Sequence, residues 1–163
     1  MTTHSRTYEY EARQPDLATM QSMPGLEYLR GILRGDHPAA PISATLGFEP
    51  VAFEHGRAVF EGVPAPFLYN PLGTIHGGWA ATLLDSAMGC AVHTTLPAGK
   101  VYTTLDFSIH LVRAITTRAK RLRCEAEIVH LGGTIATAQG RLADEAGTLY
   151  AHGTTTCLVI APK

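Results

Sequence analysis

The sequence lacks both a long apolar run and an excess of charge of one sign. No segment approaches the roughly 18 uninterrupted apolar residues of a transmembrane helix, and the N-terminal "MTTHSRTYEYEARQPD" has no apolar stretch typical of a signal peptide. The 13 Lys and Arg residues and 14 Asp and Glu residues are interspersed and leave a net charge of -1. We therefore expect a cytoplasmic protein that binds neither a membrane nor nucleic acid.

Cysteine is scarce, and the motifs of metal and cofactor chemistry are missing. Cys90, Cys124 and Cys157 are far apart in apolar contexts, so we expect reduced thiols, without a disulfide framework or a zinc site. No histidines have metal-ligand spacing, and there is no Gly-x-Ser-x-Gly elbow, P-loop or dinucleotide-binding fingerprint. The sequence predicts chemistry that needs neither a metal nor an organic cofactor.

The length of 163 residues suits one domain and is short for two. Residues 1–24 are polar and without periodicity, so we interpret them as an N-terminal arm, and the domain is predicted to cover residues 25–163. Apolar spacing and turn residues predict a helix over 26–35, a short helix with Pro41 near its start, a hairpin over 48–63, a helix over 77–94, and strands over 101–112, 120–130, 135–144 and 149–160. Short connectors favour antiparallel neighbours, so the last four strands are expected to form a meander.

The helix over 77–94 is apolar on all sides, which predicts that it is covered all round. A curved sheet wrapped around one central helix would cover it, so the fold class is α+β. In the strand "VYTTLDFSIHLV", alternation assigns Val101, Thr103, Leu105, Phe107, Ile109 and Leu111 to the core face and puts Thr104 on the other face.

Asp85 is the one formal charge in "YNPLGTIHGGWAATLLDSAMGCAV". A carboxylate removed from water costs several kcal/mol unless it is partnered or its pKa shifts. One interpretation is a structural acid satisfied by backbone or hydroxyl groups. The functional interpretation is a general base or nucleophile in a dry pocket.

The segment "NPLGTIHGG" precedes this helix. Gly77 and Gly78 allow a substrate to approach the backbone, and the first helical turn offers unpaired N–H groups at the positive end of the helix dipole. His76 either orients a group at the helix mouth or caps the loop. Asn70 either donates to a carbonyl oxygen or starts a turn.

Gly77 and Asp85 are eight residues apart, which corresponds to about 12 Å along a helix. One carbonyl group cannot contact both. If both act on the same group, one of them comes from a second chain, so this hypothesis predicts a homodimer with two equivalent sites at its interface.

The run "RAITTRAKRLR" is the one local excess of charge, with Arg113 at its start. It either holds the phosphates of a nucleotide-like group or is a solvated hairpin end.

From Leu26 to Ile160 the chain resembles the hotdog-fold acyl-CoA thioesterases, in the PaaI-like, phenylacetate-pathway branch related to hydroxybenzoyl-CoA thioesterases. The most specific part of the resemblance is "YNPLGTIHGGWAATLLDSAMGCAV". The resemblance implies a sheet wrapped around a central helix, sites between two subunits, and in many members a dimer of dimers.

Carried onto these residues, the resemblance makes Asp85 the carboxylate that activates water or attacks the thioester, and the Gly77 amide, with Asn70, the group that polarises the carbonyl. His76 corresponds to a pocket histidine, and Thr104 stands where some relatives have a water-positioning serine. Many relatives carry a basic residue at the position of Gly133, so Arg113, Thr134 or the partner subunit is left to meet the CoA phosphates. Gly78 belongs to the same substrate-binding set.

The prediction is therefore hydrolysis of an acyl-CoA thioester to the free acid and CoA. The alternative is a non-catalytic module that binds acyl-CoA. A hydratase or dehydratase of the same fold ranks last, because its His-centred arrangement is not found in this sequence.

Overall fold

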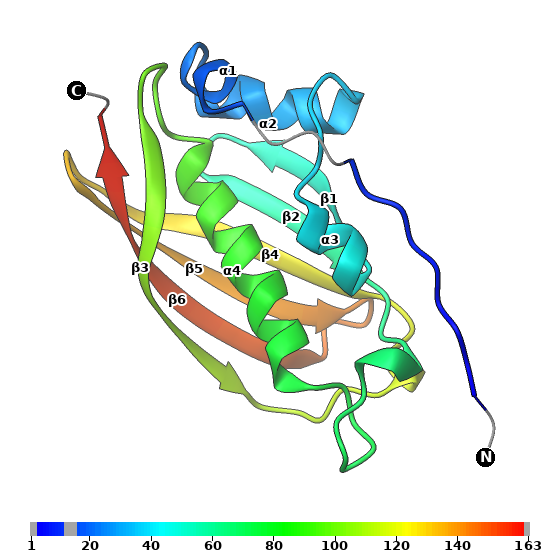
Figure 1. Cartoon of the computed structure of the whole chain (residues 1–163). Coiled ribbons are helices and arrows are strands. Elements are labelled where there is room, and N and C mark those ends of the chain that lie inside the picture. Colours follow the sequence, from blue (N-terminus) through cyan, green and yellow to red (C-terminus); the bar gives the residue numbers. More distant parts are fainter. Residues whose placement is uncertain (1–2, 12–15, 162–163) are drawn as a thin grey trace.

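The computed structural model describes residues 3–11 and 16–161 (Figure 1). The elements follow in the order α1 (Leu17–Gln21), α2 (Gly25–Arg34), α3 (Pro41–Leu46), β1 (Phe48–Glu54), β2 (Arg57–Gly62), η1 (Pro66–Leu68), α4 (Gly77–His93), β3 (Val101–Leu111), η2 (Thr117–Ala119), β4 (Leu122–Leu131), β5 (Ile135–Asp144) and β6 (Leu149–Ile160). One six-stranded antiparallel sheet curves around α4, so the predicted α+β hotdog fold is confirmed. No helix among the described residues is long and apolar enough to cross a membrane.

The sheet order is β1-β2-β4-β5-β6-β3. The predicted meander is therefore correct for β4, β5 and β6 but wrong for β3, which lies beside β6 at the far edge. The connector from β3 to β4 is no tight hairpin. It passes beneath the start of α4, where the Ile75 N–H donates to the Ile115 carbonyl and Ile115 is buried.

The helix α4 begins where the sequence predicted. Its N-cap is His76, and it ends at His93, with Thr94 as C-cap. Ten of its residues are buried against the sheet, which accounts for the apolar composition. The helix is not covered all round, however, because a stripe that includes Thr82, Asp85 and Ser86 stays half-buried within one protomer. This open stripe carries the acid.

The strand β3 contains a bulge at Leu105, between Thr104 and Asp106. The register with β6 pairs Thr104 with buried Cys157 on one side of the bulge and Phe107 with buried Thr155 on the other. Thr104 therefore faces α4, as do Phe107, Ile109 and Leu111 beyond the bulge. The predicted core face is wrong before the bulge and correct after it.

The N-terminal part of the chain packs over one edge of the sheet (Figure 1). Within the predicted arm, residues 17–21 form α1, capped by Asp16. Further on, α2 and α3 pack against β1 and cover that edge. The opposite edge, β3, is covered by no element among the described residues, and Leu105, Phe107 and Leu111 are exposed along it.

Candidate active site

Asp85 lies in the middle of α4 on its open stripe. The Thr104 hydroxyl donates a hydrogen bond of 3.2 Å to its Oδ1. Burial raises the pKa of Asp85 above the ordinary carboxyl value, and the hydrogen bond from Thr104 opposes part of that rise. The arrangement is that of a carboxylate held in one orientation with raised basicity.

Asp85 opens on a cavity of about 230 Å³. Leu29, Phe53 and Phe60 form its deep wall and are each 4% exposed. Three further lining residues come from the neighbourhood of the carboxylate, namely Ser86, Cys90 and Tyr102. The surroundings of Asp85 are therefore mainly apolar, as the sequence predicted.

The first turn of α4 presents one free amide. The His76 Nδ1 accepts from the Gly78 N–H at 2.9 Å, and the Trp79 N–H donates to the His76 carbonyl. The Gly77 N–H has no hydrogen-bond partner within the described part of the chain. Of the two predicted glycines, Gly77 thus keeps its amide available, whereas that of Gly78 is used by the capping histidine.

Gly77 lies against β3. A Cβ built there would lie 2.6 Å from Cδ1 of Leu111, so a side chain at this position would displace the end of the Leu111 side chain. The two residues are therefore in contact within the protomer. Leu111 is a site residue that the sequence did not single out.

Asn70 organises the loop before α4. Its Oδ1 accepts from the Leu72 and Thr74 N–H groups, and its Nδ2 donates to the Thr74 hydroxyl at 2.9 Å. Asn70, Gly77 and Arg113 line a second cavity of about 250 Å³, beside Leu111. Three predicted site residues are therefore brought together at the start of α4.

These two cavities share no residue, so one protomer holds the predicted site in two halves. Because α4 is continuous from Gly77 to His93, about 12 Å of helix rise separates Gly77 from Asp85. Gly133 and Thr134 line neither cavity. They lie at the β4–β5 turn, where the Thr134 carbonyl accepts from the Val159 N–H.

The basic run divides into two parts. Arg121 and Arg123 form ion pairs with Glu61 of 2.8 and 2.9 Å, so they stabilise the pairing of β2 with β4. Arg113, Arg118 and Lys120 have no ion pair within the chain described by the structure. These three cations stay available for an anionic ligand.

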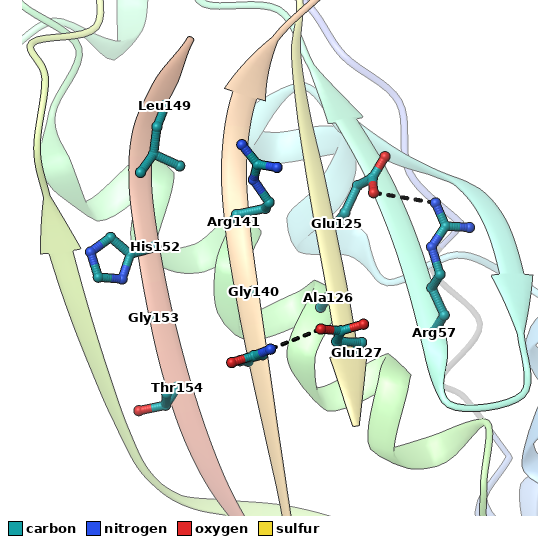
Figure 2. Close-up of a pocket in the computed structure, with 11 residues that line it drawn as sticks. Arg57, Glu125, Ala126, Glu127, Gly140, Arg141, Leu149, His152, Gly153 and Thr154 are labelled. Carbon is teal, nitrogen blue, oxygen red and sulfur yellow. Dashed lines mark hydrogen bonds and ion pairs between the residues drawn. The ribbon is translucent and has the colours of Figure 1, made fainter. Parts of the chain in front are cut away.

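A further cavity, of about 420 Å³, lies elsewhere, on the sheet face that points away from α4 (Figure 2). Its floor includes backbone at Ala126, Gly140 and Gly153, and it contains no predicted site residue. Glu125 pairs with Arg57 and Glu127 accepts from Gln139, as the dashed lines in Figure 2 show. Both acids of this cavity are thus engaged in cross-strand pairs, whereas Asp85 lies in a different cavity.

The residues 3–11 and 16–161 contain no group of three or more His, Cys, Asp or Glu side chains that could hold a metal ion. The three cysteines are free. Burial raises the pKa of the Cys90 thiol to about 12, and burial also raises those of Cys124 and Cys157. The thiols therefore have little nucleophilic thiolate at neutral pH.

Comparison with known proteins gives a family for the chain. The model of the thioesterase superfamily matches residues 72–153. A protein of Halobacterium salinarum named as a candidate esterase is 35% identical over 85 residues, which are 50% of this chain and 54% of that protein. The chain thus spans about half the length of this curated relative.

Solved structures show the same architecture. A protein of Ralstonia eutropha JMP134, named as a candidate thioesterase related to phenylacetic acid degradation, has 28% identity and a TM-score of 0.73, and the match covers 80% of this chain and 98% of that one. A Streptococcus mutans protein solved with acetyl-CoA has 24% identity and a TM-score of 0.64, over 72% and 91% of the two chains. The matched half of the sequence, and the antiparallel sheet wrapped around α4, show that this protein belongs to the thioesterase superfamily and has its hotdog fold.

Proposed function

We propose that this protein hydrolyses an acyl-CoA thioester to the free acid and CoA. The observation that carries the proposal is the Asp85 carboxylate, which has a raised pKa, a single orienting hydrogen bond from Thr104 and an apolar cavity beside it. Membership of the thioesterase superfamily supports the reaction class. The acetyl-CoA bound to the S. mutans protein of the same fold, and the unpaired cations of the 113–120 segment, support CoA as the thiol.

The chemical step needs only side chains, amides and water. Asp85 takes a proton from water as the water oxygen attacks the carbonyl carbon, and the oxyanion that forms accepts a hydrogen bond from the Gly77 amide. Collapse of the tetrahedral species breaks the C–S bond, and the CoA thiolate leaves and is protonated. Direct attack by the Asp85 carboxylate is the second route to the same products, because water then hydrolyses the mixed anhydride.

The reaction requires two copies of the chain. Because Gly77 and Asp85 of one protomer lie about 12 Å apart, the free amide must come from the partner subunit's Gly77. The uncovered edge of β3, with exposed Leu105, Phe107 and Leu111, supports pairing of this strand with its copy in a homodimer. Further pairing into a dimer of dimers, and a cytoplasmic location, remain predictions from the sequence.

The register of that pairing follows from two contacts. Thr104 contacts Asp85, and Leu111 contacts Gly77. Asp85 therefore meets the free amide when Thr104 lies opposite the partner subunit's Leu111. Leu105 is the extra residue of the bulge and is left out of the pairing count. Ser108 is then midway between Thr104 and Leu111, so antiparallel pairing in this register puts Ser108 opposite its own copy, on the two-fold axis.

The test is Asp85→Asn, with Asp106→Asn as the matched control on the exposed side of β3. We expect Asp85→Asn to lower kcat by about 10²-fold or more while acyl-CoA binding persists, and the control to keep wild-type turnover. The assay follows thiol release from short, medium, long and aryl acyl-CoAs. Binding without thiol release from any of them would replace hydrolysis with the non-catalytic alternative, and unchanged turnover in Asp85→Asn would remove this residue from the mechanism.

A further inference from the structure

The wall of the Asp85 cavity that faces α4 comes from a part of the chain outside the region shared with the superfamily model. Leu29 and Ile32 on α2, Ala39 and Ala40 in the following loop, and Ser43 on α3 all line the cavity. The matched region begins only at residue 72. The superfamily match therefore does not include this wall.

The cavity is suited to the acyl part of a substrate. When a thioester is bound at Asp85, its charged CoA portion has to lie in solvent or against the cations of the 113–120 segment. The acyl group is therefore the part that enters the cavity between α2 and α4. The deep wall of Leu29, Phe53 and Phe60 is apolar and buried. Each methylene that reaches it raises kcat/KM by about fourfold, the effect of burying one such group.

We infer that α2 and α3 form an acyl-length gauge, and that Ile32 is a specificity-determining residue that restricts the substrate to medium-length or smaller acyl groups. The inference rests on the proposed thioesterase function. If each carbon-sized group takes about as much room as one water molecule, the 230 Å³ cavity holds roughly seven or eight of them. Ile32 is half-buried, so its side chain borders this space without belonging to the fully buried core.

The wall is held in place from outside. The Arg6 guanidinium donates to the Thr45 and Ala44 carbonyls at 2.6 and 2.8 Å, at the last turn of α3, and lies 4.0 Å from the ring centre of Phe67. The N-terminal segment thereby fixes the end of α3 against the loop that follows β2. This tether restrains the α3 side of the wall, to which Ser43 belongs.

The experiment compares Ile32→Trp with Leu33→Trp. Leu33 is the next residue on α2, is 42% exposed and does not line the cavity, so it is a matched control for the same bulky substitution. The readout is kcat/KM for acetyl-, butyryl-, hexanoyl-, octanoyl-, dodecanoyl- and palmitoyl-CoA. For the wild-type protein, kcat/KM is expected to increase with acyl length up to octanoyl-CoA and to stay level for dodecanoyl- and palmitoyl-CoA.

Ile32→Trp is expected to lower kcat/KM for octanoyl-CoA by about tenfold or more and to leave acetyl-CoA within about twofold of wild type. Leu33→Trp should follow wild type at every length, and Ile32→Ala, the variant to use if the tryptophan prevents folding, should move the optimum to longer chains. The gauge would be overturned if Ile32→Trp lowered kcat/KM by the same factor at every acyl length, or if it did not lower kcat/KM for octanoyl-CoA.

Failure of the gauge and failure of the proposed function are distinguishable. If the wild-type protein releases no thiol from any acyl-CoA, hydrolysis is refuted, and the gauge is then judged by calorimetry. Octanoyl-CoA should bind Ile32→Trp about tenfold more weakly than it binds Leu33→Trp. Equal affinities would overturn the gauge on binding alone.

Discussion

Ser108→Cys tests the proposed dimer at the position where two copies of β3 would cross the two-fold axis. Ser108 is exposed on the sheet face that points away from α4, so the substitution changes neither the core nor either cavity. On the axis, the residue faces its own copy. One substitution per chain therefore supplies both cysteines of an intersubunit disulfide.

The distances decide the outcome. Directly opposed residues of an antiparallel pair have Cα atoms about 4.5–5.5 Å apart, within the range of about 4.4–6.8 Å that a disulfide spans. His110 is two residues from the axis, so the two copies of it are separated by four residue steps, or about 14 Å. His110→Cys, on the same face of the same strand, is thus a control that cannot form the bond.

The assay is mild oxidation followed by a non-reducing gel. Ser108→Cys should run mostly at twice the mass of the 17.5 kDa chain and keep its thioesterase activity, whereas His110→Cys and wild type should stay at the single-chain position. Wild type also controls for the native thiols. The register is refuted if Ser108→Cys crosslinks no faster than His110→Cys in protein that light scattering shows to be dimeric, and a fully active monomer would refute the composite site itself.

Three further predictions concern titrating groups. Thr104→Val removes a hydrogen bond that lowers the pKa of Asp85, so the acid limb of the kcat/KM–pH profile should move to higher pH. Thr104→Ser should restore the wild-type profile. If the acid limb of Thr104→Val does not move, the Thr104 hydroxyl does not affect the pKa of the general base. Cys90, with a thiol pKa of about 12, should react with iodoacetamide at pH 8 about 10³-fold more slowly in the folded than in the unfolded chain, as measured by mass spectrometry of the labelled peptide. Burial lowers the pKa of His93 to about 4, so the unfolded chain takes up its proton first and stability falls as pH drops from about 6.5 towards 4, by about 2 kcal/mol between pH 7 and pH 5. His93→Phe should remove that pH dependence in urea unfolding without losing a hydrogen bond, because neither ring nitrogen of His93 has a partner within the described residues.

Much of the site could be predicted from sequence because its signals are local. The double glycine preceded by a histidine defines the start of α4, and the aspartate within its apolar run is the proposed reactive group. The separation of Gly77 from Asp85 needs only the rise of a helix. These arguments depend on residues within about 10 positions of each other along the chain, where the helical backbone leaves little freedom.

The rest depends on contacts between distant segments. Leu29, Ile32 and Ser43 precede Asp85 by more than forty positions, and the spacing of α2 shows an amphipathic helix without showing what its apolar face covers. The edge position of β3 was missed for a similar reason. The short connector after it suggested a hairpin, but β4 pairs with β2 and leaves β6 as the neighbour of β3.

The bulge at Leu105 is the part that no periodicity could locate, and the proposed site depends on it. Apolar side chains occupy five of the six odd positions of β3, the exception being Thr103, so a regular strand would point Phe107, Ile109 and Leu111 inward and turn Thr104 away from Asp85. The extra residue lets both ends face α4, with Thr104 on the carboxylate and Leu111 on Gly77, and it leaves Leu105 57% exposed. One strand then contacts both halves of the proposed site, so pairing of β3 with its copy would bring the acid of one subunit to the free amide of the other. The proposed composite site therefore depends on the same irregularity that made the face of Thr104 unpredictable from the sequence.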